Sequence, residues 1–233
     1  MFSRLNSLGV LLLCSTQLLG QPQIAPKTLA PPENPVTLDQ LRRFEDVAAI
    51  TEVTHGLLQR GFLQQKSQLP PWWPETIWNE MVENILKVDK VAIDLPFYQQ
   101  CYSQQEARFF IHLFETPGGH AYARHMVGLE AEKIGDGASV SDARTSMMSS
   151  QPGLDPAMIK TLDQEDQRQA QVVFGTHRSA DITACVGNVS PKALEIFQAK
   201  QVAVVQAVVE AHSSELDAAE SKYNLEHAGK TAK

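Results

Sequence analysis

Residues 103–124 read SQQEARFFIHLFETPGGHAYAR, and this stretch predicts two helices joined at a corner. Ser103 followed by Glu106 has the spacing of a capping box, in which each side chain satisfies a free backbone N–H of the other residue. Behind this start, apolar residues recur at the spacing of one helical face: Ala107, Phe110, Ile111 and Phe114. The segment is therefore expected to begin with an amphipathic helix whose apolar side faces a core.

The end of this helix and the start of the next are marked in the sequence as well. We expect the helix to end at Thr116, because a residue before proline is pushed out of the α region. Thr116 can then cap a second helix that begins at Pro117, where the missing N–H costs nothing. Gly118 and Gly119 lack side chains, so the two helices can approach closely. These signals predict an αα-corner.

This block resembles a bacterial family catalogued as domain of unknown function 2059, whose members carry a Thr/Ser-x-x-Glu helix start followed by Phe-Tyr-x-Ser/Thr-Pro-x-Gly. The resemblance covers about residues 95–129, and residues 95–98 resemble the short helix that leads into the family block. Leu113 and Phe114 replace the usual aromatic pair, and Ala121 stands where a lysine is common. The resemblance implies an extracytoplasmic, mostly helical protein without an established activity. The residues matching the family signature are Ser103, Glu106, Phe114, Thr116, Pro117 and Gly119.

A second copy of the first helix is predicted where residues 163–176 align with residues 103–116 without a gap. Ser103 meets the alternative cap Asp163, and Glu106 meets Asp166. The second copy, about residues 163–185, lacks the Pro-Gly-Gly, and two glutamines replace apolar residues, so its corner is expected to differ and its helix to be more exposed. We interpret the match as a weak internal duplication. The identities pair Gln104, Arg108, Phe114 and Thr116 with Gln164, Arg168, Phe174 and Thr176.

The remaining segments predict an all-α multi-helix bundle with a single helical domain over residues 37–226. Thr37 is expected to cap a helix over about residues 38–65, which Gly56 and Gly61 are able to bend or interrupt. A further helix is expected over about residues 157–176, and a last one from Pro191 with Ser190 as its cap. No long alternating run of β-branched residues is present, so strands have little support.

The stretch Pro-Pro-Trp-Trp-Pro at residues 70–74 allows two interpretations. The favoured one is a helix start, with Pro74 at the first position and Trp72 packed on Ile77. The alternative is an exposed platform formed by Trp72 and Trp73 for a peptide, a glycan or a membrane surface.

The N-terminal residues 1–20 have the pattern of a secretory signal peptide, with Arg4 ahead of an apolar run and a cleavage site near Gly20. The run is far shorter than the ~20 residues that a membrane span requires, so no transmembrane span is expected after signal removal. Cys14 leaves lipidation open, although Leu13 is bulky for that processing. Residues 21–36 are expected to form a Pro-rich mobile leader, and residues 227–233 a frayed tail. We therefore expect an exported protein, periplasmic or secreted.

Two cysteines, Cys101 and Cys185, remain after removal of the signal peptide. An even number in an exported protein favours a disulfide between them. The alternative is two buried thiols, because cysteine is among the most buried residue types.

The composition and the motifs limit the function classes. A net charge of −7 gives no basic surface of the kind that binds nucleic acid, so nucleic acid is not expected as a partner. The seven histidines lack the spacing of a zinc site, and the chain has no nucleophile elbow or phosphate loop, so we expect no metal, cofactor or catalytic residue. The favoured class is a non-catalytic module of the cell envelope that binds a protein, a peptide or a lipidic ligand. The alternative is a hydrolytic or metal-dependent enzyme using His112, Glu115 and His120.

Overall fold

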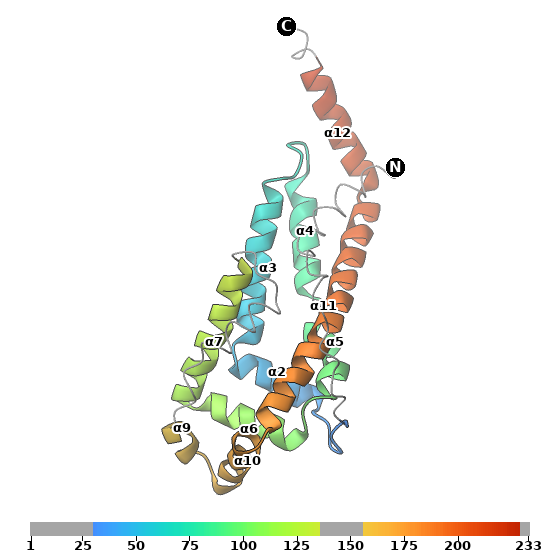
Figure 1. Cartoon of the computed structure of the whole chain (residues 1–233). Coiled ribbons are helices and arrows are strands. Elements are labelled where there is room, and N and C mark those ends of the chain that lie inside the picture. The colour runs from blue at the N-terminus through green and yellow to red at the C-terminus, as the bar shows by residue number, and fades with distance from the viewer. Residues whose placement is uncertain (1–29, 136–155, 229–233) are drawn as a thin grey trace. The chain divides into compact units, whose positions relative to one another are not determined.

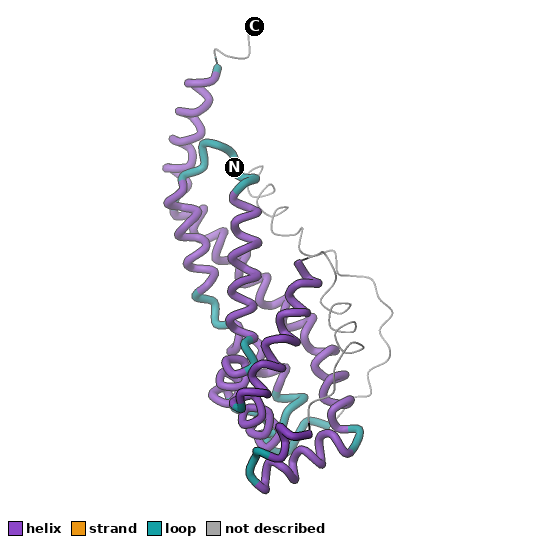
Figure 2. Tube along the Cα trace, turned by 90° about the vertical axis from the view of Figure 1, so that its left-hand side faces the viewer, coloured by secondary structure: helices purple, strands orange, loops and turns teal. Residues whose placement is uncertain are grey.

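The computed structural model describes residues 30–135 and 156–228, and these ranges form an all-α multi-helix bundle, as predicted (Figure 1). Within them Figure 2 shows helices and loops, and no strand is formed apart from one isolated β-bridge. In chain order the helices are α2 (Leu38–Val47), α3 (Ile50–Lys66), α4 (Glu75–Leu86), α5 (Lys90–Tyr98), α6 (Gln104–Glu115), α7 (Pro117–Gly135), α9 (Pro156–Lys160), α10 (Gln164–Gly175), α11 (Arg178–Ala211) and α12 (Ser213–His227).

The described residues divide into two compact units, each made of segments far apart in the sequence. The terminal unit contains residues 58–88 and 196–228, and the corner unit contains residues 30–57 and the described part of 89–195. Helices α3 and α11 each contribute residues to both units. The sequence patterns, from which we predict one domain over residues 37–226, do not indicate this division.

The terminal unit has a core built on the apolar face of α4. Trp72 and Trp73 are half-buried against this core, which agrees with the helix-start interpretation of residues 70–74 and not with an exposed platform. Pro74 occupies the N-cap position of α4 rather than the first helical position, so the helix begins one residue later than predicted, at Glu75. The buried members of the core are Phe62, Ile77, Trp78, Met81, Ile85, Val205, Val208 and Leu216.

The corner unit is organised around α6, which packs against α2, α7 and α10. Because neighbours lie on several sides, α6 is buried over more than the single stripe that its sequence predicts. Ala107 and Ile111 are buried as expected, but Phe114 is only half-buried. The most deeply buried side chains of α6 are instead Phe109 and Leu113.

The helix predicted over residues 38–65 is two helices. Thr37 and Gln40 form a capping box at the start of α2, but α2 ends at Val47. Ala49 has a φ of 59°, in the left-handed region, so a right-handed helix cannot pass through it. Helix α3 then begins at Ile50 and includes both Gly56 and Gly61, so the glycines do not cause the break.

Two further helix boundaries differ from the predictions. The segment 157–176 contains α9 and α10, because Asp163 caps a new helix. The predicted start at Ser190 and Pro191 is wrong: α11 runs through both residues, and the Ser190 hydroxyl donates to the Val186 carbonyl. The C-terminal helical region is interrupted instead at His212, the N-cap position of α12.

The end of the predicted mobile leader is held in place. The Val36 N–H donates to the Tyr102 carbonyl at 3.0 Å, and the Gln104 N–H donates to the Asn34 carbonyl at 2.8 Å. The Val36 side chain is buried beside Leu41 and Ala107. These contacts attach the end of the predicted leader to the residues at the start of α6. The predicted signal peptide, the rest of the leader and residues 229–233 of the predicted tail lie outside the described residues.

Candidate functional site

The corner between α6 and α7 forms as its sequence predicts. The Glu106 N–H donates to the Ser103 hydroxyl at 3.2 Å, and the Ser103 N–H donates to the Glu106 carboxylate at 2.8 Å. Thr116 is extended between the helices, and its hydroxyl accepts the Gly119 N–H at 3.0 Å. A Cβ on Gly119 would lie 1.9 Å from the carbonyl oxygen of Leu113, so only glycine fits this junction.

Helix α10 has the same length as α6 and the same kinds of N-cap and C-cap, which supports the internal duplication. Both helices have twelve residues, and the Asp163 carboxylate accepts the Asp166 N–H at 2.8 Å as Ser103 accepts that of Glu106. Both end at a threonine with an extended backbone, Thr116 and Thr176. The second corner differs, as expected without the Pro-Gly-Gly, because the Thr176 hydroxyl accepts the N–H of Arg178 two residues on.

Each copy contributes a buried acid that pairs with a base from the other copy. Glu106, 5% exposed, accepts hydrogen bonds from the Arg178 guanidinium, one of them at 2.9 Å. Burial raises the pKa of Glu106, but the hydrogen bonds from Arg178 and Ser103 outweigh it, and the pKa lies below its ordinary value. Asp166, 3% exposed, lies 2.5 Å from Nδ1 of His112. The sequence analysis does not predict either of these pairs between the two copies. The alignment of Glu106 with Asp166 was the available signal that the two acids have equivalent positions.

The predicted disulfide between Cys101 and Cys185 is confirmed. The sulfurs are 2.02 Å apart, and the two Cα atoms are separated by 5.5 Å. Cys101 is fully buried, and its carbonyl accepts a hydrogen bond from the Arg178 guanidinium at 2.8 Å. The bond therefore joins the residues just before α6 to α11, beside the Glu106–Arg178 pair.

The three side chains of the enzyme alternative do not converge. His112 contacts Asp166, whereas Glu115 accepts hydrogen bonds at 2.9 and 2.7 Å from the guanidinium of Arg43 on α2. Nδ1 of His120 lies 2.9 Å from the Val47 carbonyl at the end of α2. Each group is thus used in a different contact between helices.

One group of side chains has the composition of a metal site: His112, Asp163 and Asp166 each offer a ligand atom, all within 4.8 Å of one another. The Arg108 guanidinium lies 3.4 Å from Asp163 and 3.9 Å from Asp166. The Asp166 N–H, followed by the charge of Arg108, lowers the pKa of Asp163. Because Arg108 already supplies positive charge to both carboxylates, the group is explained as an ion-pair network between α6 and the start of α10.

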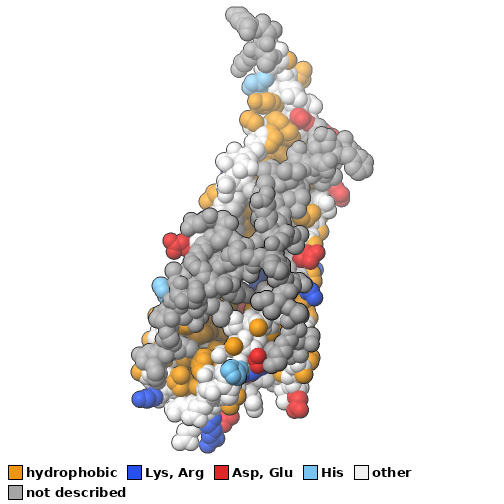
Figure 3. Space-filling view, viewed as in Figure 1, with side chains coloured by type: hydrophobic (Ala, Val, Ile, Leu, Met, Phe, Trp, Pro, Cys, Tyr) orange, Lys and Arg blue, Asp and Glu red, His pale blue; other side chains and the backbone are white. Residues whose placement is uncertain are grey.

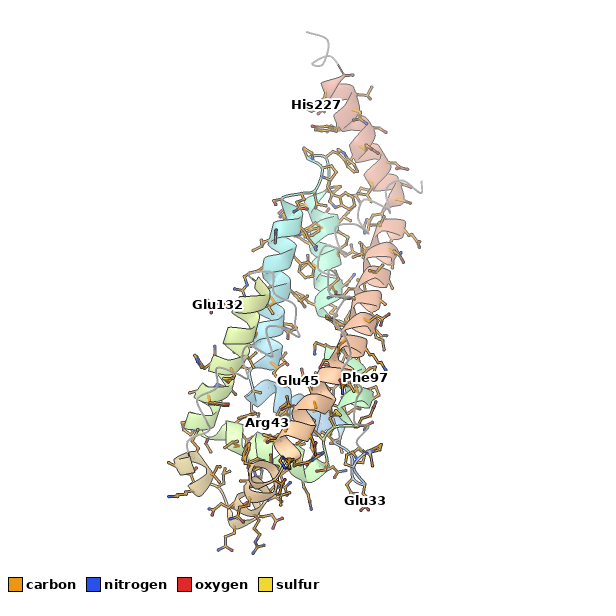
Figure 4. The ribbon with its side chains drawn as sticks, in the orientation of Figure 1. Glu33, Arg43, Glu45, Phe97, Glu132 and His227 are labelled. Carbon is orange, nitrogen blue, oxygen red and sulfur yellow. A yellow bond between two sulfur atoms is a disulfide. The ribbon has the colours of Figure 1, made fainter. Side chains whose placement is uncertain are left out.

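Sequence reasoning also missed the most deeply buried carboxyl group among the described residues. Glu45, labelled on α2 in Figure 4, is 2% exposed. It follows the buried Leu41 by four residues and therefore shares its helix face, which was the available signal. Asp94 on α5 is also buried, and its negative charge raises the pKa of Glu45.

The surface carries charge of both signs. On the face drawn in Figure 3, outside the grey atoms, basic and acidic side chains are interspersed with apolar ones rather than gathered by sign. Large apolar side chains exposed in the corner unit are Val172, 50% exposed, and Phe174, 38% exposed, both on α10. Within the described ranges, no helix combines the length and the apolarity needed to cross a membrane.

Comparisons of the chain with family models, with curated proteins and with solved structures find no match. The resemblance of residues 95–129 to the domain of unknown function 2059 family therefore stays a prediction.

Proposed function

We propose that this chain is an exported, non-catalytic binding module of the cell envelope, periplasmic or secreted. The signal-like residues 1–20 support export, with processing near Gly20. The Cys101–Cys185 disulfide supports it independently, because such bonds persist in oxidising compartments. Membership of the domain of unknown function 2059 family is part of the same proposal, and it rests on the residues of the α6–α7 corner.

The observation that carries a binding role is the pair of large apolar side chains left exposed on α10, Val172 and Phe174. In the first copy, Phe114 packs against Phe44 of α2, with ring centroids 6.0 Å apart. Its counterpart Phe174 contacts the edges of Phe109 and Phe110, yet keeps 38% of its surface exposed. Val172 on the same helix is half exposed. A protein, a peptide or a lipidic ligand would gain by covering such side chains.

Crosslinking in intact cells tests the binding role. Val172→Asp places a charge on the open surface and should abolish the recovery of the crosslinked partner. Its effect on the free energy of unfolding should stay within ~0.5 kcal/mol, because the position is exposed. Gln164→Asp introduces the same charge at an exposed position two turns away on α10 and serves as the control. Equal recovery of partners with wild type and Val172→Asp would contradict the proposal.

Export is tested separately by N-terminal sequencing of the protein recovered from the envelope or the medium. We expect the mature chain to begin close to residue 21. Recovery of most molecules with Met1 intact would contradict signal removal, whatever the crosslinking shows.

A further inference from the structure

Glu45 is a buried acid whose Oε1 atom has no hydrogen-bonding partner among the described residues. Its side chain lies on the face of α2 that carries Leu41, and its residue is 2% exposed. Within the described part of the chain, its Oε1 atom receives no hydrogen bond. Burial of an ionised carboxylate in such a place is costly unless a cation or donors compensate it. The protonation state of Glu45 therefore depends on the charges around it.

Those charges come mainly from α5, a helix that α2 packs against. Lys90 favours the ionised form of Glu45, whereas Asp94 and Asp89 disfavour it. Lys90 already binds the carboxylate of Asp94, which is 3% exposed. Asp89 is exposed and pairs with Arg42 at 2.7 Å.

Within the described residues, no group on α6 or α7, which also contact α2, is among the charges that act on Glu45. On α2 itself, Asp46 is exposed and pairs with Arg43 at 3.0 Å. The cation available to Glu45 is therefore Lys90, which Asp94 already engages.

The buried acids Glu45 and Asp94 and the half-buried Lys90 thus form a group of two carboxyl groups and one ammonium group. It is electrically neutral only when one of the carboxyl groups holds a proton. We propose that Glu45 and Asp94 share one proton together with Lys90, so that the contact between α2 and α5 is a proton-sensitive switch. The contact is tight while Glu45 is protonated and weakens when Glu45 ionises.

The electrostatics of the group agree with this geometry. Burial raises the pKa of Glu45 from 4.5 to about 7, with Lys90 lowering it and Asp94 raising it. Burial likewise raises the pKa of Asp94, against the opposing effect of Lys90. The pair therefore passes from one bound proton to none close to neutral pH.

The direction of the pH effect follows from linkage. The folded chain holds the Glu45 proton up to a higher pH than the unfolded chain does, so the contribution of Glu45 to stability is greatest at low pH. That contribution falls as the pH rises from about 4.5 to about 7 and then levels off. Between pH 5 and pH 8 this single group should raise the unfolding equilibrium constant roughly 70-fold.

The first experiment measures denaturant unfolding of the purified, disulfide-bonded chain between pH 5 and pH 8. In Glu45→Gln the side chain cannot ionise, so the rise of roughly 70-fold should disappear from its pH profile. Asp46→Asn, which changes the exposed acid next in the chain, should keep the wild-type profile. Identical profiles for wild type and Glu45→Gln would overturn the proposal.

A second experiment does not depend on the folding of Glu45→Gln. The carboxyl carbon of Glu45 is titrated by NMR in the selectively labelled chain. Asp94→Asn should move the midpoint to lower pH, because it removes a negative neighbour and frees Lys90. Lys90→Met should move the midpoint to higher pH. A wild-type midpoint near 4.5, or a midpoint that neither variant moves, would overturn the proposal.

Discussion

Arg178 satisfies two buried acceptors with one side chain. Its guanidinium binds both oxygens of the Glu106 carboxylate and the carbonyl of Cys101. Glu106 in turn closes the capping box of α6 with Ser103. The arginine therefore links the start of α6, the disulfide and the start of α11, and its removal would leave a buried charge without its cation.

We predict that Arg178→Met destabilises the chain by roughly 3–5 kcal/mol, because it removes one partner of a buried ion pair. Arg43→Met is the matched control, since Arg43 also binds a glutamate, Glu115, but both are exposed. That change should cost much less than Arg178→Met, because an exposed ion pair contributes little to stability. Denaturant unfolding at neutral pH measures both effects, and equal losses would show that burial does not matter at Arg178.

The Glu106–Arg178 pair also predicts a dependence on acid. The pKa of Glu106 is lowered in the folded chain, so its contribution to stability is present above its unfolded value of 4.5. That contribution is lost as the pH falls through the lower, folded value. The difference in unfolding free energy between wild type and Arg178→Met should therefore shrink in acid below about pH 4.

The α6–α7 corner depends on one of its two glycines. A Cβ on Gly119 would meet the backbone of Leu113 at 1.9 and 2.7 Å, and backbone atoms cannot move aside cheaply. A Cβ on Gly118 would meet only the Met158 side chain, at 2.8 Å, and a flexible thioether can turn away.

We therefore predict that Gly119→Ala destabilises the chain by at least the ~1–3 kcal/mol typical of overpacking. Gly118→Ala should change the free energy of unfolding by less than ~1 kcal/mol, because the better helix propensity of alanine offsets the shift of Met158. Thermal or denaturant melts of the two variants distinguish the positions. A Gly119→Ala protein as stable as Gly118→Ala would mean that the helices do not meet as described.

Helix α11 contains a proline, Pro191, in its interior, and we predict that this residue lowers the stability of the chain. Pro191 has no N–H to donate to the carbonyl four residues earlier, which costs an interior helical position ~3 kcal/mol. Pro191→Ala should therefore stabilise the chain by about 1–3 kcal/mol. Pro117→Ala, at the first position of α7, should give no such gain, because no helical N–H is required there. A loss of stability in Pro191→Ala would show that the proline shapes the helix in a way the packing requires.

Helix starts were predictable where a side chain acts on its own backbone. Thr37, Ser103 and Asp163 cap helices within three residues of themselves, so their sequence spacing contains the whole interaction. The break at Ala49 and the continuation through Pro191 depend instead on packing between distant segments, which local spacing does not describe. The same holds for the candidate site: the positions of His112 and Glu115 on α6 were predictable, but not that Asp166 and Arg43 would meet them.

Across the molecule, the Cys101–Cys185 bond restricts the unfolded chain. The cysteines are 84 residues apart, and a loop of that size corresponds to about 4–5 kcal/mol in the chain-entropy treatment. We predict that the double variant Cys101→Ala/Cys185→Ala loses roughly 2–5 kcal/mol of unfolding free energy. Reduction of the wild-type chain should give a comparable loss. Mass spectrometry of a non-reduced digest checks the bond in protein taken from its own compartment, and two alkylatable thiols there would contradict it.

The same bond makes residues 101–185 a closed covalent ring with a polypeptide tail on each side. Helices α6 and α10, the two copies of the repeated helix, both lie on this ring. A protease that cuts one peptide bond between the two helices opens the ring but releases no fragment. The disulfide holds the two pieces together, so the cut molecule keeps its full mass on a denaturing, non-reducing gel. A cut in either tail frees a fragment at once. The two copies can therefore lose their connecting backbone and remain parts of one molecule until a reductant reaches the buried sulfur of Cys101.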